Sequence, residues 1–179
     1  RLALHGRECV EVVERLWVYL GLPIGHAKQQ VRGQANHGIA AANISVLHAF
    51  QQVFHRYSLD KNHVDLFLQS MEWDLKRADY DRVGFEQYIV GSAEVVGLMC
   101  LKIFVDGDEA EYLRLKPAAM KLGSAFQKIN FLRDLNADYK HLGRVYFPGI
   151  DMNEFNATVK HDIERDIEAD FHAGYLGIL

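Results

Sequence analysis

Apolar residues recur at spacings of three and four through most of the chain, which is the period of an α-helix. In residues 46–57 the apolar positions are Val46, Leu47, Phe50, Val53, Phe54 and Tyr57. Asp60 follows as the expected N-cap of a second helix, whose apolar side carries Val64, Phe67, Met71 and Leu75. Alternation of apolar and polar residues is nearly absent. The pattern therefore predicts an all-α fold.

Three more helices are predicted after Gly84, which interrupts the apolar pattern. Residues 85–104 are apolar on nearly all sides, which is typical of a buried helix. Residues 106–112 form a polar connection, and Pro117 suits the first turn of a long helix that runs to about residue 141. Gly143 and Pro148 end it. The last helix is acidic, and its apolar side carries Phe155, Val159, Ile163 and Ile167.

The first 43 residues differ from the rest, because glycines are frequent there and the helical period is weak. Only one helix is expected in that segment, around Val10 to Leu20. Residues 44–179 carry the regular pattern, and neither repeats nor linkers interrupt them. We therefore expect residues 1–179 to form a single helical domain with an atypical start.

Composition narrows the class of protein. The chain has 179 residues, of which 49% are hydrophobic and 25% charged, as in soluble globular proteins. The net charge of −4 gives no electrostatic reason to expect nucleic acid as a partner. Cys9 and Cys100 are too few for a disulfide framework and fit a reducing cytosol. No uninterrupted apolar run reaches the roughly 20 residues of a membrane span, and no signal-peptide pattern is seen.

We therefore expect a cytoplasmic protein whose contact with membranes, if any, is peripheral. The sequence predicts no oligomeric state.

Residues 117–141 carry two stripes at helical spacing. The apolar stripe, expected to face the core, consists of Leu122, Phe126, Ile129 and Leu132. The second stripe, which we name the acid–amide face, consists of Gly123, Gln127, Asn130, Asp134 and Asp138. A step of four residues advances a helix by about 6 Å, so the two carboxylates can share a hard cation. Mg²⁺ is commonly bound through carboxylates together with substrate phosphates.

Basic residues accompany this face. Lys128 and Arg133 border it, and Arg144 follows in the next loop. Guanidinium groups match the geometry of phosphate with paired hydrogen bonds. The combination indicates a metal-bridged diphosphate. On spacing alone, however, the polar end of an ordinary helix explains such an acid pair more often.

Residues 122–148, LGSAFQKINFLRDLNADYKHLGRVYFP, favour the diphosphate site, because they resemble the second aspartate-rich signature of the squalene and phytoene synthase family. The matching residues are Gln127, Asn130, Arg133, Asp134, Asp138, Gly143, Arg144, Phe147 and Pro148. Residues 70–99 resemble the central stretch of the same family, with Tyr88, Ala93, Val96 and Gly97 in the matching places. The resemblance runs from about Ile44 to the end of the chain and is strongest to bacterial phytoene synthases.

The resemblance implies an isoprenoid-synthase type helical bundle around a central cavity. It also implies a prenyltransferase that joins two prenyl diphosphates head to head through a cyclopropyl diphosphate. Our first hypothesis is condensation of two geranylgeranyl diphosphates to phytoene in carotenoid biosynthesis, with release of diphosphate. Because such an enzyme loses a proton in its last step, NADPH is not expected.

The same resemblance assigns roles to individual residues. Asp134 and Asp138 would bind Mg²⁺, or Mn²⁺ in its place, and with Arg133 they are the catalytic candidates. Gln127, Asn130 and Arg133 would support the diphosphate, and the substrate-binding candidate Arg144 belongs to the loop that would cover it. Tyr88, Ala93, Val96 and Gly97 would border the channel for the prenyl chain.

The chain also departs from the family pattern. Ala137 stands where a glutamate is usual, and Gly91 where many members have a second tyrosine. No aspartate precedes Asp60, so the first aspartate-rich motif is missing, and we take Glu11 and Glu14 as ordinary helix-surface residues. We expect a truncated or divergent copy, incomplete at both ends. With one carboxylate cluster, residues 1–179 should bind prenyl diphosphates weakly and form no measurable phytoene.

Two alternatives stay open. One is a squalene or dehydrosqualene synthase that acts on farnesyl diphosphate, which differs in channel length, a quantity that sequence does not measure. The other is a non-catalytic helical relative that has lost the first motif.

Other residues invite a bland interpretation. Asp162, Asp166 and Asp170 are spaced like metal ligands, yet Lys160 and Arg165 intervene, and we expect a solvated helix face. Met71, Trp73 and Met99 are expected in the core. Gly91 and Gly97 are expected to allow close helix packing.

Overall fold

A computed structural model describes residues 37–76 and 80–178, and every structural statement here concerns those residues. The chain divides into two compact units, residues 1–59 and 60–179. Each regular element that the structure describes is a helix, which confirms the all-α prediction. The helix expected around Val10 to Leu20, with Glu11 and Glu14, lies outside the described residues. The single-domain organisation stays a prediction.

The described part of the first unit is the helix α2 (His37–Arg56) with the turn that ends it. Phe50 and Phe54 lie one turn apart, with ring centroids separated by 6.3 Å. After the helix, the amide of Leu59 donates to the carbonyl of Phe54 at 3.0 Å. The apolar period of residues 46–57 therefore predicted this helix correctly.

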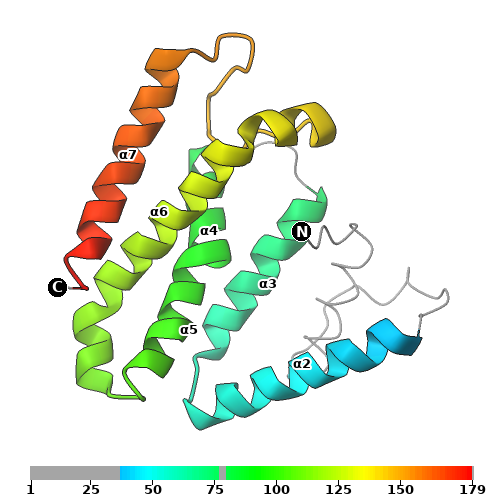
Figure 1. Cartoon of the computed structure of the whole chain (residues 1–179), viewed down its shortest axis with the longest axis vertical. Helices are drawn as coiled ribbons and strands as arrows, with labels where there is room; N and C mark the ends of the chain where they lie inside the picture. Colours follow the sequence, from blue (N-terminus) through cyan, green and yellow to red (C-terminus); the bar gives the residue numbers. More distant parts are fainter. Residues whose placement is uncertain (1–36, 77–79, 179) are drawn as a thin grey trace. The chain divides into compact units, whose positions relative to one another are not determined.

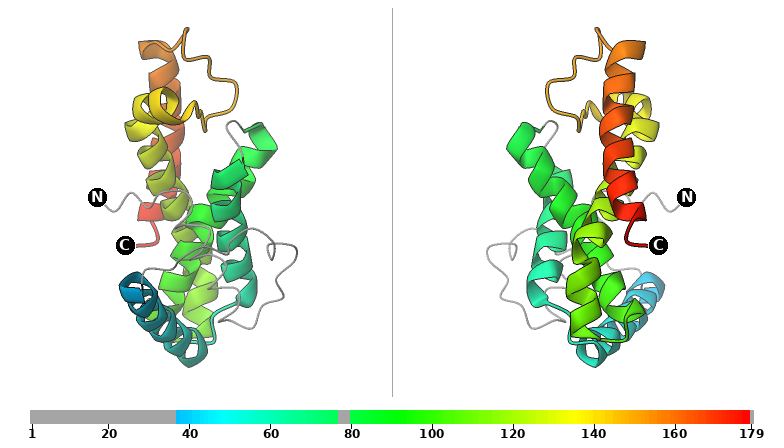
Figure 2. Two further views of the ribbon diagram at one scale, coloured as in Figure 1. Left: turned by 90° about the vertical axis from the view of Figure 1, so that its right-hand side faces the viewer. Right: turned by 90° about the vertical axis from the view of Figure 1, so that its left-hand side faces the viewer.

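The second unit contains five α-helices and one π-helix among its described residues. These are α3 (Lys61–Lys76), α4 (Arg82–Ile89), η1 (Val90–Glu94), α5 (Val95–Phe104), α6 (Glu109–Leu142) and α7 (Ala157–Tyr175). Figure 1 shows α4, η1 and α5 as one continuous rod between α3 and α6, with α7 along the other side of α6. The side views agree (Figure 2). The long helix α6 is therefore packed on both sides.

Carboxylate caps fix where these helices begin. The amide of Asn62 donates to Asp60 at 2.8 Å, as predicted for the start of α3. Asp81 accepts a hydrogen bond from the amide of Gly84 at 2.7 Å. Gly84 therefore lies inside α4 and does not interrupt the pattern as expected, because the cap satisfies amide groups that a helix start leaves unpaired.

The long helix α6 begins eight residues earlier than predicted. Asp108 accepts hydrogen bonds from the amides of Ala110 and Glu111, so the helix starts at Glu109. Pro117 stands inside the helix, where it gives up one backbone hydrogen bond. The predicted end is confirmed, because Gly143 closes the helix with a left-handed φ of 62°.

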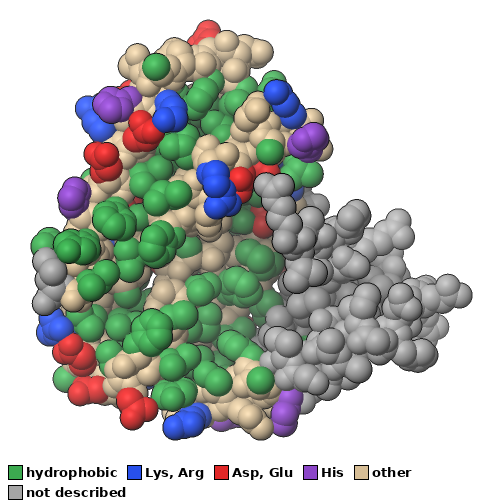
Figure 3. All heavy atoms as spheres, in the orientation of Figure 1, with side chains coloured by type: hydrophobic (Ala, Val, Ile, Leu, Met, Phe, Trp, Pro, Cys, Tyr) green, Lys and Arg blue, Asp and Glu red, His purple; other side chains and the backbone are tan. Residues whose placement is uncertain are grey.

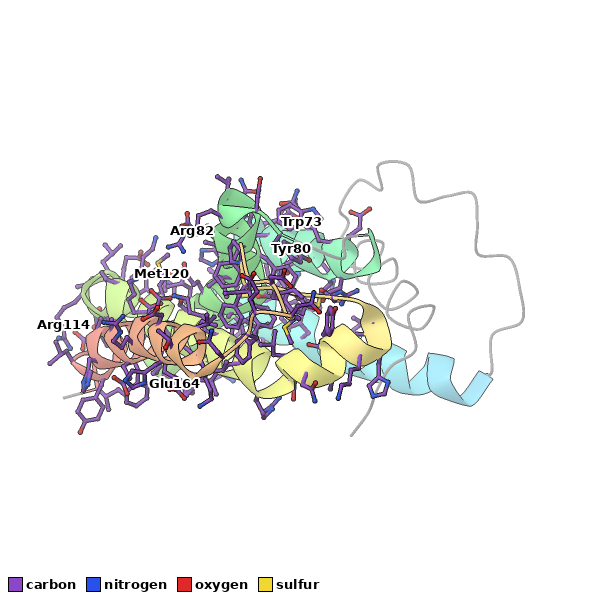
Figure 4. All side chains as sticks on the ribbon, turned by 90° about the horizontal axis from the view of Figure 1, so that it is seen from above. Trp73, Tyr80, Arg82, Arg114, Met120 and Glu164 are labelled. Carbon is purple, nitrogen blue, oxygen red and sulfur yellow. The ribbon has the colours of Figure 1, made fainter. Side chains whose placement is uncertain are left out.

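An aromatic core joins α4, α6 and the loop after α6. Its buried members are Tyr80, Phe85, Tyr88, Ile89, Phe131, Leu135, Tyr146 and Phe147. The rings of Phe131 and Tyr146 stack at a centroid distance of 4.0 Å. Trp73 packs against this core, as predicted, and Figure 4 shows it beside Tyr80.

The rod packs against α6 by direct backbone contact. A Cβ at Gly123 would lie 2.8 Å from the carbonyl oxygen of Ala93, and one at Gly97 would lie 3.0 Å from that of Ala119. On the other side of the rod, a Cβ at Gly91 would lie 2.5 Å from the Leu66 carbonyl oxygen. Gly91 and Gly97 therefore serve close helix packing, as predicted.

Charged side chains join α6 to α7. Asp170 is 6% exposed and accepts hydrogen bonds from Lys121 at 2.6 Å, Ser124 at 2.7 Å and Lys128 at 2.7 Å. Lys128 also donates to Asp166 at 2.6 Å. The prediction of a solvated helix face is thus wrong for Asp170. Its carboxylate can be buried because the three donors compensate the loss of water. Lys128 likewise turns to α7 and not to the acid–amide face.

Within the described residues, the stretch Arg82–Phe104 is long and apolar enough, by length and composition alone, to cross a membrane. It is not the buried helix that its composition predicted, because only a third of its most apolar window is buried. Glu86, Glu94 and Lys102 interrupt the apolar run after Arg82.

The contact between Gly123 and Ala93 can be tested by adding one methyl group. Gly123→Ala should lower the free energy of unfolding by about 1–3 kcal/mol, because a backbone carbonyl cannot yield to the new Cβ. This loss should appear although alanine favours helix more than glycine does. Urea unfolding measures it, with Asn136→Ala, at an exposed position of the same helix, as control. A Gly123→Ala protein as stable as the wild type would contradict the close contact.

The buried charge cluster makes a second prediction. Asp170→Asn should cost about 2–4 kcal/mol at neutral pH, because it leaves the nearly buried Lys128 ammonium with only one carboxylate. The matched control is Asp162→Asn, whose exposed pair with Arg165 should be worth less than about 1 kcal/mol. Equal losses in chemical denaturation would show that Asp170 is solvated after all.

Candidate functional site

The faces of α6 do not divide as the apolar stripe predicted. The face buried in the protein carries Ser124, Ala125, Lys128, Phe131 and Leu135. Phe126 and Ile129 of the predicted core stripe are 54% and 40% exposed. Leu132 packs against the aromatic core as predicted, whereas Leu122 and Phe126 line a cavity, because apolar side chains of a cavity wall can show the same spacing as those of a core.

A cavity of about 520 Å³ lies against this exposed apolar face. It is lined by Ser92, Ala93, Val96, Gly97, Cys100, Leu101, Phe104, Leu115, Ala118, Ala119, Leu122, Gly123, Phe126, Gln127, Gly174, Gly177 and Ile178. Hydrophobic side chains gather over α5, α6 and α7 on the face shown in Figure 3. The lining explains why the part of the rod from residue 92 to residue 104 carries apolar side chains that are not buried.

The structure brings four of the sequence-predicted site residues together in this cavity. Ala93, Val96 and Gly97 line it from the rod, and Gln127 lines it from α6. Of the acid–amide face, Gly123 and Gln127 belong to the lining, and Asn130, Asp134 and Asp138 continue the same face toward the end of α6. The acid–amide face therefore runs into the cavity.

Tyr88 is placed elsewhere, in the aromatic core. Its hydroxyl donates to Asp74 at 2.7 Å, and the residue is 3% exposed. Burial first, and then the charge of Asp74, raise the pKa of Tyr88 far above its ordinary value. The phenol therefore stays protonated and donates to Asp74, and Tyr88 is not among the residues that line the cavity.

The turn after α6 brings Arg144 back beside the helix. The amide of Arg144 donates to the carbonyl of Asp138 at 3.3 Å, around the left-handed Gly143. Its guanidinium donates to the Tyr146 hydroxyl at 2.8 Å and to the Asp74 carbonyl at 2.5 Å. Its Nε is buried and has no hydrogen-bond partner in the described structure. The Nε–H of this cation is thus a buried donor that the described residues leave unpaired.

The two predicted ligands differ in their surroundings. The guanidinium of the neighbouring Arg133 donates to both carboxylate oxygens of Asp134, from Nε at 2.9 Å and from Nη2 at 2.6 Å. The pKa of Asp138 is raised above its ordinary value by burial first, then by the charge of Asp134; Arg144 opposes this and Asp74 adds to it. Negative charge therefore accumulates around Asp138, and a cation would relieve it.

This donor set fits a Mg²⁺ ion that is shared with phosphate oxygens. Two carboxylates, Asp134 and Asp138, lie one turn apart, and a cationic donor, Arg144, lies next to them. In the described part of the chain no three acidic, histidine or cysteine side chains are grouped to hold a metal by themselves. Mg²⁺ commonly takes one or two carboxylates and completes its shell with substrate phosphates and water.

Asp74 and Tyr146 are functional candidates that the sequence reasoning missed. Tyr146 donates to Asp74 at 3.0 Å, opposite the hydrogen bond from Tyr88, so both carboxylate oxygens are occupied. Asp74 lies 60 residues before Asp134, and no spacing rule connects the two. For Tyr146, the sequence offers only its position two residues after Arg144.

Comparison with known proteins decides the family. A family described as squalene/phytoene synthase matches residues 24–175, most of the chain. The chain belongs to the squalene/phytoene synthase family. The match starts ahead of Ile44, where the motif resemblance begins. The helical architecture agrees with the all-α isoprenoid-synthase fold of this family.

Two curated relatives share part of the sequence. A 4,4'-diapophytoene synthase of Staphylococcus haemolyticus (strain JCSC1435) is 39% identical over 90 residues, which cover 49% of this chain and 29% of the relative. A bifunctional lycopene cyclase/phytoene synthase of Blakeslea trispora is 31% identical over 112 residues, or 62% of this chain and 18% of the relative. The matched part thus spans less than a third of either relative.

The crowding of negative charge at Asp138 makes a prediction about stability. A carboxyl whose pKa is raised by folding destabilises the fold when ionised, at pH values above its folded pKa, and the effect disappears as the pH falls below its ordinary value. Asp138→Asn should therefore raise the melting temperature at pH 7 by about 1–3 °C. The gain should shrink toward pH 4.

Glu168→Gln, an exposed acid on α7, is the control and should change the melting temperature little at either pH. If Asp138→Asn lowers the melting temperature at pH 7, the carboxylate is stabilised by its surroundings, and the proposed charge balance is wrong.

Proposed function

We propose that the chain carries the magnesium-diphosphate site and prenyl channel of a phytoene synthase-type prenyltransferase, which condenses two geranylgeranyl diphosphates head to head. The observation that supports this best is the position of Gln127, which belongs to the acid–amide face and also lines the apolar cavity. A charged group at Asp134 and Asp138 would therefore have its hydrocarbon chain in the cavity, which is the shape of a prenyl diphosphate.

In this proposal Asp134 and Asp138 hold Mg²⁺, which when bound supplies a Lewis acid for the leaving diphosphate. With Asp134 as a metal ligand, the Arg133 guanidinium would be free to pair with a phosphate oxygen. Arg144 keeps its hydrogen bonds to Tyr146 and Asp74 and holds its positive charge beside Asp138, where it would attract the diphosphate. Both arginines stabilise the charge that grows on the leaving group.

The apolar lining of the cavity would surround part of the prenyl chain on which ionisation leaves a carbocation. The nucleophilic side chains among the lining residues are Ser92 and Cys100. Deprotonation then ends the reaction without a hydride donor, so NADPH is not required. A cytoplasmic enzyme in peripheral contact with a membrane would release such a hydrocarbon into the bilayer.

A second candidate is condensation of farnesyl diphosphate, as in dehydrosqualene synthesis. It is favoured by the relative that is 39% identical, because that relative is a 4,4'-diapophytoene synthase. Both candidates use the same acid–amide face and differ only in the length of chain in the cavity.

Binding tests the site directly. Mg²⁺ together with the unreactive S-thiolodiphosphate analogue of geranylgeranyl diphosphate should raise the melting temperature of the chain, because a ligand of the native state stabilises it. Asp134→Asn should abolish the shift and leave the unliganded melting temperature nearly unchanged. The matched control, Asp162→Asn, removes an exposed acid of α7 and should keep the full shift. Equal ligand-dependent shifts in wild type and Asp134→Asn would contradict the proposal.

A further inference from the structure

The contacts between the rod and α6 fix which residues face each other along the cavity. Gly123 of α6 contacts Ala93, and Gly97 contacts Ala119 of α6. Four residues forward along the rod therefore correspond to four residues backward along α6. Continuing this antiparallel register places Val96 level with Met120 and Cys100 level with Lys116. The depth of any lining residue can therefore be counted along α6.

We take Gln127, which belongs to both the acid–amide face and the cavity lining, as the place where the prenyl chain begins. Along α6, Lys116 and with it the level of Cys100 lie eleven residues from Gln127, about 16–17 Å at 1.5 Å per residue. An isoprene unit adds four carbon–carbon bonds to an extended chain, about 4–5 Å at the usual single-bond length. Three units from Gln127 thus end at about 12–15 Å, short of Cys100, and four units reach about 16–20 Å. Cys100 lies at the depth of the fourth unit.

On the side of the rod, the cavity wall carries mostly small side chains up to this depth and bulky ones beyond it. Ala93, Gly97 and Cys100 are small, with Val96 between them, and Leu101 and Phe104 follow. Cys100 is exposed in the described structure and forms no disulfide. Enlarging its side chain would therefore fill the cavity without disturbing the core.

We propose that Cys100 determines the chain-length specificity of the prenyl channel, because its small side chain leaves room for a fourth isoprene unit. The inference rests on the proposed function and adds a preference for twenty-carbon over fifteen-carbon prenyl chains. The residue acts by size, so a large side chain at position 100 converts the channel to one for three units.

The test measures binding of three unreactive S-thiolodiphosphates with Mg²⁺ by calorimetry, carrying ten-, fifteen- and twenty-carbon chains. Cys100→Phe should weaken binding of the twenty-carbon compound about tenfold or more, the cost of overfilling a packed site. Binding of the fifteen-carbon compound should change less than about twofold. Cys100→Leu, a smaller addition, should give the same ordering and covers the case that Cys100→Phe does not fold.

Two further variants test depth and specificity. Val96→Phe, one turn nearer to Gln127 at about 10 Å, should weaken the fifteen- and twenty-carbon compounds alike and spare the ten-carbon one. Leu113→Phe adds an aromatic ring at an exposed position of α6 outside the cavity lining and should leave all three affinities unchanged.

An unchanged affinity of Cys100→Phe for the twenty-carbon compound would overturn the inference, and so would equal losses for fifteen and twenty carbons. These outcomes leave the proposed function intact, since wild-type protein still binds prenyl diphosphates. If wild-type protein binds none of the three compounds with Mg²⁺, the proposed function itself fails, and the inference with it.

Discussion

The backbone contact between Gly123 of α6 and Ala93 of the rod is the constraint on which the rest of the second unit depends. No side chain separates the two helices there, and a second contact at Gly97 and Ala119 repeats it one turn away. Two such contacts fix both the distance and the register of the helices. The cavity wall, its depth and its polar end follow from this register.

With one face of α6 packed against the rod, its other faces contact α7, the aromatic core and the cavity. Lys128 and Ser124 bind Asp170 on α7, so a buried charge cluster and not an apolar face holds that helix. Phe131 stacks on Tyr146 and connects the aromatic core to the loop that carries Arg144. The remaining face is free to carry apolar residues along the cavity and carboxylates at its end.

The sequence predicted the helical fold, the start of α3 and the end of α6, because caps and periodicity are local signals. It misjudged the start of α6 at Pro117, since the cap at Asp108 outweighs the preference of proline for a first turn. It also assigned Phe126 to the core and Asp170 to solvent. Spacing cannot tell a cavity wall from a core, or a paired buried carboxylate from a solvated one.

The site divides in the same way. Ala93, Val96, Gly97 and Gln127 were found from short motifs on two helices, and the structure brings them together. Asp74 was missed because its link to Arg144 and Tyr88 exists only in three dimensions. Motifs therefore located residues that line the cavity, and the fold was needed to find the residues that contact Arg144 and Tyr88.

The most direct test of the central claim, that one register connects the carboxylates of α6 to a channel four isoprene units deep, is the alkylation rate of Cys100. The rate is measured by peptide mass spectrometry, which separates Cys100 from Cys9, with Mg²⁺ and each thiolodiphosphate at saturation. The account predicts that the twenty-carbon compound slows alkylation strongly, and that inorganic diphosphate and the ten-carbon compound do not. Unchanged alkylation with the twenty-carbon compound bound would contradict it.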